Sequence, residues 1–235
     1  MRAGIDALDA QLLTLDDGLQ WVGLQNYAQV LRDPDWWLAV RNTMVFSILS
    51  VTFETLFGLG IALVLNMEFR GRSLMRAAVL IPWAIPTVIS AKMWTWMYND
   101  MYGVINAGLM LIGVIDEPVA WLSSANTAMA ALVIVDVWKT TPFMALLILA
   151  GMQLIPKDVY EAAKLDSDSP LRVFAHITLP LLKPTIAVAV IFRALDALRV
   201  FDLFYVLTGN KIETGTVTIY ARQRLKALEN GPRQS

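Results

Sequence analysis

Near its C-terminal end the chain carries four ionisable residues at every third position of an otherwise apolar stretch: Arg193, Asp196, Arg199 and Asp202. Charged side chains at membrane depth are costly and usually face a helix-bundle interior or a watery cavity. Their alternating signs favour a structural role, in which neighbours three positions apart neutralise each other and hold helices together. The alternative is that this ladder borders a path and binds a solute together with Phe192, Phe201 and Tyr205.

Two further apolar stretches contain isolated charges. Glu54 is the only charged residue in residues 42–66, and Asp136 and Lys139 stand in residues 127–154. Asp136 and Lys139 are three positions apart, so they share one helical face and can neutralise each other. We interpret all three as polar contacts between helices. An integral membrane enzyme that uses Glu54 or Asp136 as a buried acid is the alternative.

The sequence offers little else for catalysis, metal binding or nucleic-acid binding. It has no Cys and a single His, His176, which excludes disulfides, thiolate metal sites and histidine clusters. No Ser, Cys or carboxylate pair forms a recognisable catalytic group with His176. A formal net charge of −1 argues against nucleic acid. A GxxxxGK[ST] phosphate loop is absent, so nucleotide chemistry would belong to a partner.

The elements that position these residues are predicted to be membrane-spanning helices. Hydrophobic residues make up 57% of the 235 residues, against about 45–50% in soluble domains. Four runs are long enough, at about 1.5 Å per residue, to cross a hydrocarbon core of about 30 Å. We therefore expect an all-α, polytopic membrane helical bundle. The predicted spans are residues 42–66, 77–98, 127–154 and 181–207. Residues 1–41 would form an extramembranous or interfacial arm, and residues 208–235 a tail.

The second predicted span contains two prolines, Pro82 and Pro86. Proline inside a span frees backbone carbonyls and kinks the helix, which membranes tolerate where other helices or water satisfy those groups. This span is therefore expected to line something rather than to face lipid.

The charges of the loops predict the orientation. Residues 67–76 carry three Arg against one Glu, whereas residues 99–126 carry no Lys or Arg. Short cytoplasmic loops are enriched in Lys and Arg, so residues 67–76 and 155–183 are expected inside and both termini outside. The basic tail departs from this rule: either the rule is overridden there, or a further span would have followed the tail.

The inner loop, residues 155–183, is predicted to form a helix, a turn and a second helix. Pro156 suits a first helical position and acidic residues follow it, which predicts a short helix to Leu165. Residues 166–168 have turn chemistry. The second helix would begin at Pro170 and be ended by Pro180. An amphipathic connector that rests on lipid headgroups is the alternative interpretation.

The same loop resembles a known signature. Its matching residues are Glu161-Ala162-Ala163, Asp166, Ile177, Leu179 and Pro180. They resemble the EAA motif of permease subunits of bacterial binding-protein-dependent ABC sugar importers of the maltose and trehalose type. Further matching stretches lie at residues 22–27, 42–43, 80–82, 137–143, 201–203 and 205–209. The resemblance covers residues 22–209, with Ser167 where the signature has Gly. That family has one span before and one after the region seen here, so the chain is expected to be truncated or diverged at both ends.

The resemblance implies the core of a type I ABC importer permease, a transport subunit and not an enzyme. The coupling contacts to an ATPase would come from Glu161, Ala162, Ala163, Leu165, Asp166 and Ser167. The supporting loop helix would contribute Phe174, Ile177, Leu179 and Pro180. The translocation path would be bordered by Arg193, Asp196, Arg199, Phe201, Asp202 and Tyr205.

The implied partners are a second permease subunit, cytoplasmic ATPase subunits that bind the ATP, an extracytoplasmic sugar-binding protein and membrane lipid. The permease itself would hold no cofactor, and its place would be the bacterial cytoplasmic (inner) membrane. The rival interpretations are the membrane enzyme described above and a truncated, non-functional membrane scaffold.

Overall fold

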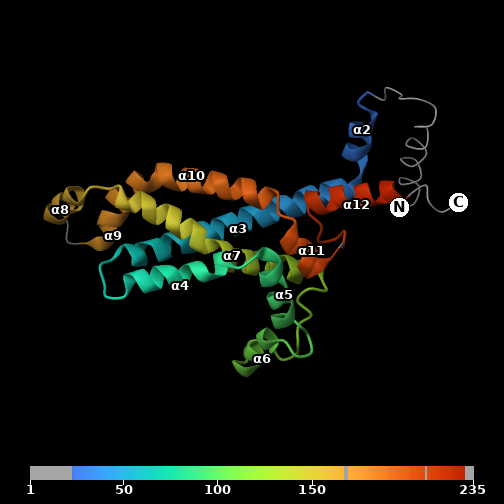
Figure 1. The fold of residues 1–235 in the computed structure, drawn as a ribbon, viewed down its shortest axis with the longest axis horizontal. Helices are drawn as coiled ribbons and strands as arrows, with labels where there is room; N and C mark the ends of the chain where they lie inside the picture. Colours follow the sequence, from blue (N-terminus) through green and yellow to red (C-terminus); the bar gives the residue numbers. More distant parts are fainter. Residues whose placement is uncertain (1–22, 167–168, 210, 231–235) are drawn as a thin grey trace.

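The computed structural model describes residues 23–166, 169–209 and 211–230, and every regular element in them is helical (Figure 1). Three long helices form the body: α3 (Pro34–Asn66), α7 (Ala125–Gln153) and α10 (Leu179–Leu198). They run along the long axis of the molecule and pack on one another. The predicted all-helical bundle is confirmed.

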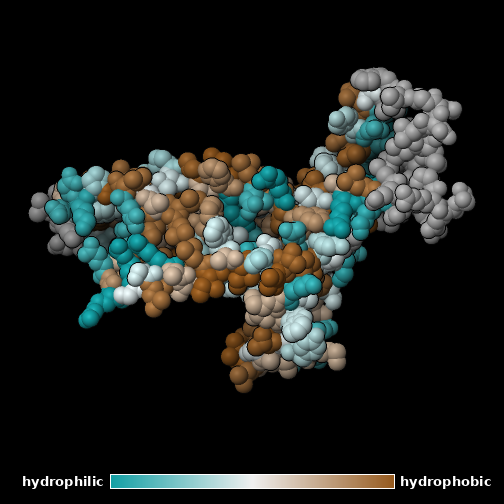
Figure 2. All heavy atoms as spheres, in the orientation of Figure 1, coloured by the Kyte–Doolittle hydropathy of each residue, from teal (hydrophilic) through white to brown (hydrophobic). Residues whose placement is uncertain are grey.

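Three helical stretches in the described residues are long and apolar enough to cross a membrane, namely Pro34–Asn66, Thr127–Gln153 and Pro170–Leu198. Apolar residues cover the middle of the molecule, and hydrophilic residues gather at one end (Figure 2). The first of these stretches, α3, begins at Pro34, eight positions before residue 42, where the first span was predicted to begin. The Asp33 carboxylate accepts a hydrogen bond of 2.9 Å from the Asp35 amide, and proline suits the first helical position.

The second predicted span is two helices and not one, which corrects the expected range of residues 77–98. α4 (Arg72–Ala84) and α5 (Thr87–Met97) meet at a bend of 87°. Ile85 is extended there because the residue before a proline, here Pro86, is disfavoured in helical conformation. Pro82 remains inside α4. Beyond the bend, α5 and the short α6 (Val104–Leu111) extend to the side of the bundle (Figure 1).

The inner loop begins with α8 (Lys157–Asp166), close to the prediction. The prediction that Pro180 ends the second loop helix is wrong. α9 (Pro170–Val173), a π-helical turn (Phe174–Thr178) and α10 form one continuous helix. The Leu179 amide donates to the Phe174 carbonyl, five residues back, so the backbone is already widened where Pro180 lacks an amide hydrogen.

The fourth predicted span is also wrong at its end. α10 ends at Leu198, Arg199 is its C-cap, and a separate short helix, α11 (Asp202–Thr208), follows. The ladder of charges is therefore divided between two helices. The last helix, α12 (Val217–Asn230), lies beside the beginning of α3 (Figure 1).

The two loops expected on the same side of the membrane do lie together. Lys157 of α8 and Glu68 of the α3–α4 loop are 3.5 Å apart, both largely exposed. Such an exposed ion pair contributes little stability, but it shows that both loops occupy one end of the bundle. α2 (Gln25–Arg32) and α12 occupy the other (Figure 1).

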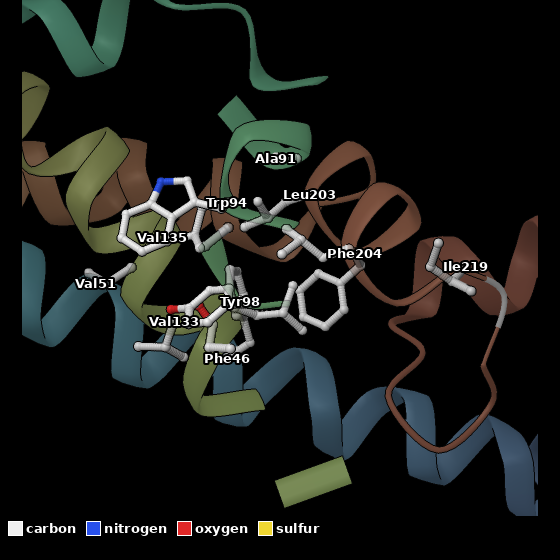
Figure 3. Close-up of a cluster of buried hydrophobic side chains, with 14 residues drawn as sticks. Phe46, Val51, Ala91, Trp94, Tyr98, Val133, Val135, Leu203, Phe204 and Ile219 are labelled. Carbon is white, nitrogen blue, oxygen red and sulfur yellow. The ribbon is translucent and has the colours of Figure 1, made fainter. Parts of the chain in front are cut away.

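Two apolar clusters hold the bundle together. The first lies toward the α12 end and includes Phe46 and Phe204, whose rings meet edge to face at 4.9 Å (Figure 3). The second lies toward α8 and includes Met144 and Leu182. Here α3 and α7 approach closely, since a Cβ added at Gly58 of α3 would lie 2.8 Å from Met144 Cγ of α7.

Candidate functional site

A buried ion cluster lies between the two apolar clusters, centred on Arg193 of α10. The Arg193 side chain is 3% exposed. Its guanidinium donates to both carboxylate oxygens of Glu54 on α3, at 2.6 and 3.0 Å. It also donates to Asp136 Oδ2 of α7 at 2.5 Å and to Asp196 Oδ2 at 2.8 Å. One cation therefore links the three long helices through charge-assisted hydrogen bonds.

One turn of α7 supplies most of the remaining polar contacts. Thr140 Oγ1 donates to Glu54 Oε1 at 2.5 Å. Lys139 Nζ donates to the carbonyl of Ile85 at 2.8 Å and to that of Trp83 at 3.4 Å. Asp136 and Lys139 therefore do not form the ion pair that their spacing predicts. Asp136 binds Arg193, and Lys139 binds the carbonyls of Trp83 and Ile85, because the end of a helix favours a cation.

The first half of the ladder forms the contacts expected of a structural role. Arg193 and Asp196 form an ion pair three positions apart, and Arg193 ties α10 to its neighbours. Two buried carboxylates and a buried guanidinium are costly to desolvate unless each finds good partners, and here each does. The Asp196 side chain, 70% exposed, brings the cluster to the protein surface.

The second half of the ladder lies elsewhere. Arg199 is exposed and donates to the Leu195 carbonyl at 3.3 Å, while Asp202 is exposed in the first turn of α11. The rings of Phe201 and Tyr205 stack at 5.4 Å and an interplanar angle of 12°. Of the six residues predicted to border a path, Arg193 and Asp196 therefore lie in the ion cluster and Phe201 and Tyr205 form the aromatic pair, whereas Arg199 and Asp202 belong to neither.

Arg222 of α12 completes the aromatic pair and was missed by sequence reasoning. Its guanidinium carbon lies 4.1 Å from the Tyr205 ring centroid and 5.2 Å from that of Phe201. This is cation–π geometry. The only sequence signal was the unexplained basic character of the tail.

A second contact of α12 was also missed. Asp33 Oδ2 accepts a hydrogen bond of 2.7 Å from the Tyr220 hydroxyl and another from Arg224. Burial acts to raise the pKa of the Asp33 carboxyl, but the hydrogen bonds from Tyr220 and from the Asp35 amide and the charge of Arg224 outweigh it. The pKa of Asp33 therefore lies below its usual range.

The predicted coupling residues lie on α8. Glu161 and Ala162 are exposed, whereas Ala163 is buried at 4% exposure, so of the two alanines only Ala162 is available for a contact with a partner. Leu165 and Asp166 end α8, and Ser167 lies outside the described residues. Of the predicted supporting residues, Phe174, Ile177 and Leu179 are half-buried and Pro180 is exposed.

An apolar cavity of about 590 Å³ opens between α3, α4 and α7. Phe53 and Phe57 line it from α3, Pro82 from α4, and Trp138 and Pro142 from α7. The prediction that the proline-containing second span lines something agrees with the position of Pro82. In the described residues no group of three or more His, Cys, Asp or Glu side chains is arranged to hold a metal ion.

Residues 54–227, which contain the ion cluster, α8 and the aromatic pair, match the family of binding-protein-dependent transport system inner membrane components. The chain belongs to this family. It is thus the membrane-embedded permease of a transport system and not an enzyme.

Named relatives of this permease transport several compounds. The trehalose/maltose transport system permease protein MalF of Thermococcus litoralis is 53% identical over 199 residues, 85% of this chain and 67% of the relative. The sulfoquinovosyl glycerol permease SmoG of Agrobacterium fabrum is 42% identical over 209 residues, 88% of this chain and 67% of the relative. The trehalose permease SugA of Mycobacterium tuberculosis is 39% identical over 219 residues, 93% of this chain and 69% of the relative.

The permease also shares its fold with a solved importer. A bacterial ABC transporter that imports the acidic polysaccharide alginate superposes with a TM-score of 0.78 at 24% identity, over 89% of this chain and 77% of that one. A bacterial alginate ABC transporter in complex with an alginate pentasaccharide-bound periplasmic protein superposes with a TM-score of 0.78 at 25% identity, over 89% of this chain and 75% of that one. The predicted importer fold is thereby confirmed.

Proposed function

We propose that this chain is a permease subunit of an ATP-driven importer that carries a sugar across the cytoplasmic (inner) membrane. The observation that carries this proposal is the position of α8. The helix stands at one end of the bundle with Glu161 and Ala162 exposed, and only residues 154–156 separate it from α7. A force applied to α8 would therefore act directly on the helix that holds the ion cluster.

The partners follow from this arrangement. A cytoplasmic ATPase, which binds the ATP, would contact the exposed face of α8, where Ala162 allows close approach and Glu161 offers a charge to a basic residue. A second permease subunit would complete the path. A sugar-binding protein would dock at the opposite end, near α12; a periplasmic protein is also found in complex with the alginate transporter. The permease itself needs no cofactor in this scheme.

The names of the relatives support a sugar as the transported compound, since they are named for trehalose, maltose and sulfoquinovosyl glycerol. In our proposal the path passes the exposed carboxylate of Asp196 and the stacked rings of Phe201 and Tyr205. A carboxylate accepts hydrogen bonds from sugar hydroxyls, and aromatic faces pack against sugar rings. The ion cluster beneath Asp196 holds that carboxylate in place.

Alternating access would arise by a rigid-body movement of the long helices. Closure of the ATPase pair would pull α8, and α7 would carry the movement to the ion cluster. Because Arg193 joins α3, α7 and α10, these helices are expected to move as one unit.

The test is uptake by proteoliposomes that contain the assembled transporter, with Ala162→Glu in the permease. We expect ATP hydrolysis to become uncoupled from sugar uptake while the complex still inserts, because the new side chain prevents close approach at α8. Leu171→Glu is the matched control, since Leu171 is exposed on α9 at the same end of the bundle. Unchanged uptake for Ala162→Glu would reject α8 as the coupling helix.

A further inference from the structure

The bend between α4 and α5 leaves the C-terminal end of α4 without its regular hydrogen bonds. Helix ends carry carbonyls that lack intrahelical donors, and a cation is favoured there. Lys139 Nζ lies 2.8 Å from the Ile85 carbonyl oxygen and 3.4 Å from that of Trp83. Lys139 is only 8% exposed. A buried ammonium group from α7 therefore caps the broken helix.

The same turn of α7 is bound to two other helices. Asp136 accepts from Arg193 of α10, and Thr140 donates to Glu54 of α3. Next to the cap, the rings of Trp83 and Phe143 stack at 5.7 Å and an interplanar angle of 13°. Residues 136–143 of α7 thus hold α3, α4 and α10 at one level of the bundle.

We propose that Lys139 is a positioning residue that sets the angle between α4 and α5. Pro86 prevents a regular helix at Ile85, but a proline only disfavours the helical conformation of the residue before it and does not select one bend angle. The angle is selected because one ammonium group holds the carbonyls on the α4 side of the bend. Lys139 thereby joins the bend to α7, so that the two move together.

The consequence for transport rests on the proposed function. A displacement of α8 would pass through α7 to Lys139 and would change the direction of α5. α5 carries Trp94, which packs against Trp138 of α7 at 5.5 Å and belongs to the apolar cluster at the α12 end. The bend would thus transmit a movement from the α8 end to the opposite end of the bundle.

The angle is measurable by spin labelling, because the chain has no native Cys. One label replaces Ser73 on α4 and the other replaces Trp96 on α5, both exposed positions. Electron–electron double resonance on the assembled transporter in lipid nanodiscs then reports the distance between the two helices. Lys139→Met removes the charge and keeps the stem. We expect a broadened distance distribution with a shifted mean.

Two controls isolate the ammonium group. Lys139→Arg keeps a cation within reach of the carbonyls and is expected to retain the wild-type distribution. Lys92→Met removes an exposed lysine of α5 and is expected to change nothing. If Lys139→Met is not recovered from membranes, Lys139→Gln replaces it. The same shift is expected, because the glutamine side chain is too short to reach the carbonyls of Trp83 and Ile85. A wild-type distribution for the neutral variant would overturn the proposal.

Sugar uptake separates this proposal from the proposed function. We expect Lys139→Met to lower uptake per inserted transporter about tenfold, and Lys139→Arg to restore it. A merely structural lysine would lower the amount of folded protein without changing uptake per folded molecule. An altered distance together with unchanged uptake would uphold the positioning role and reject the bend as part of transport.

Discussion

Glu54 and Arg193 are 139 residues apart in the sequence and share two hydrogen bonds, of 2.6 and 3.0 Å, between α3 and α10. The fork of an Arg guanidinium matches a carboxylate in this way, and burial strengthens the pair. Because Asp136 binds the same guanidinium, two buried carboxylates depend on a single cation.

Arg193→Met is therefore expected to be strongly destabilising, by about 3–5 kcal/mol, because it leaves Glu54 and Asp136 unpaired in the bundle. The midpoint of thermal unfolding in detergent measures this. Arg199→Met is the matched control and should have almost no effect, since Arg199 is exposed. Adding Glu54→Gln and Asp136→Asn to Arg193→Met should recover part of the loss. If the triple variant were no more stable than the single one, unpaired charge would not be the cause.

The close approach of α3 and α7 gives a second prediction. A Cβ at Gly58 would lie 2.8 Å from Met144 Cγ and 3.1 Å from the backbone nitrogen of Ala145, which cannot move aside without shifting α7. Gly58→Ala should therefore cost about 1–3 kcal/mol.

Gly60→Ala is the matched control for Gly58→Ala, on the same helix. No atom lies within 4 Å of a Cβ added at Gly60. Alanine there should raise stability by about 0.5–1 kcal/mol through helix propensity. Thermal unfolding of the two variants side by side measures the difference, and equal effects would contradict the close packing of α3 on α7.

The lowered pKa of Asp33 predicts that the attachment of α12 depends on pH. A carboxyl whose pKa is lower in the folded state contributes stability above its unfolded value, about 3.9, and that stability is lost as pH falls through the folded pKa. A spin label at the exposed position Ala221 should thus become more mobile between about pH 5 and pH 2.

Asp33→Asn should make the label at Ala221 mobile at every pH, because the ionised partner of Tyr220 and Arg224 is gone. Asp202→Asn, at an exposed position of α11, should behave like the wild type. Mobility that changes with pH in the Asp33→Asn variant would assign the transition to another group.

Local patterns in the sequence predicted most helices, the common side of the two inner loops and the Arg193–Asp196 pair, because neighbours three apart on a helix must meet. The partners of Lys139 and Asp33 were not predictable in this way. They lie 54 and 187 residues away, and no spacing rule connects such positions. The effect of a proline on a helix is likewise not predictable from its position in the sequence alone. Pro86 breaks a helix, whereas Pro180 continues one because a π-helical turn precedes it.

The contact of Arg222 with the aromatic pair gives the last prediction. A guanidinium over an aromatic face contributes about 0.5–1 kcal/mol at partly exposed sites, so Arg222→Met should lower the stability of the permease only slightly. If Phe201 and Tyr205 border the sugar path, as we propose, the loss of the cation that holds their rings should raise the KM for uptake severalfold with little change in maximal rate. Lys226→Met, exposed on the same helix, is the control. An unchanged KM with the expected small loss of stability would remove the aromatic pair from the path and leave it as a packing contact between α11 and α12.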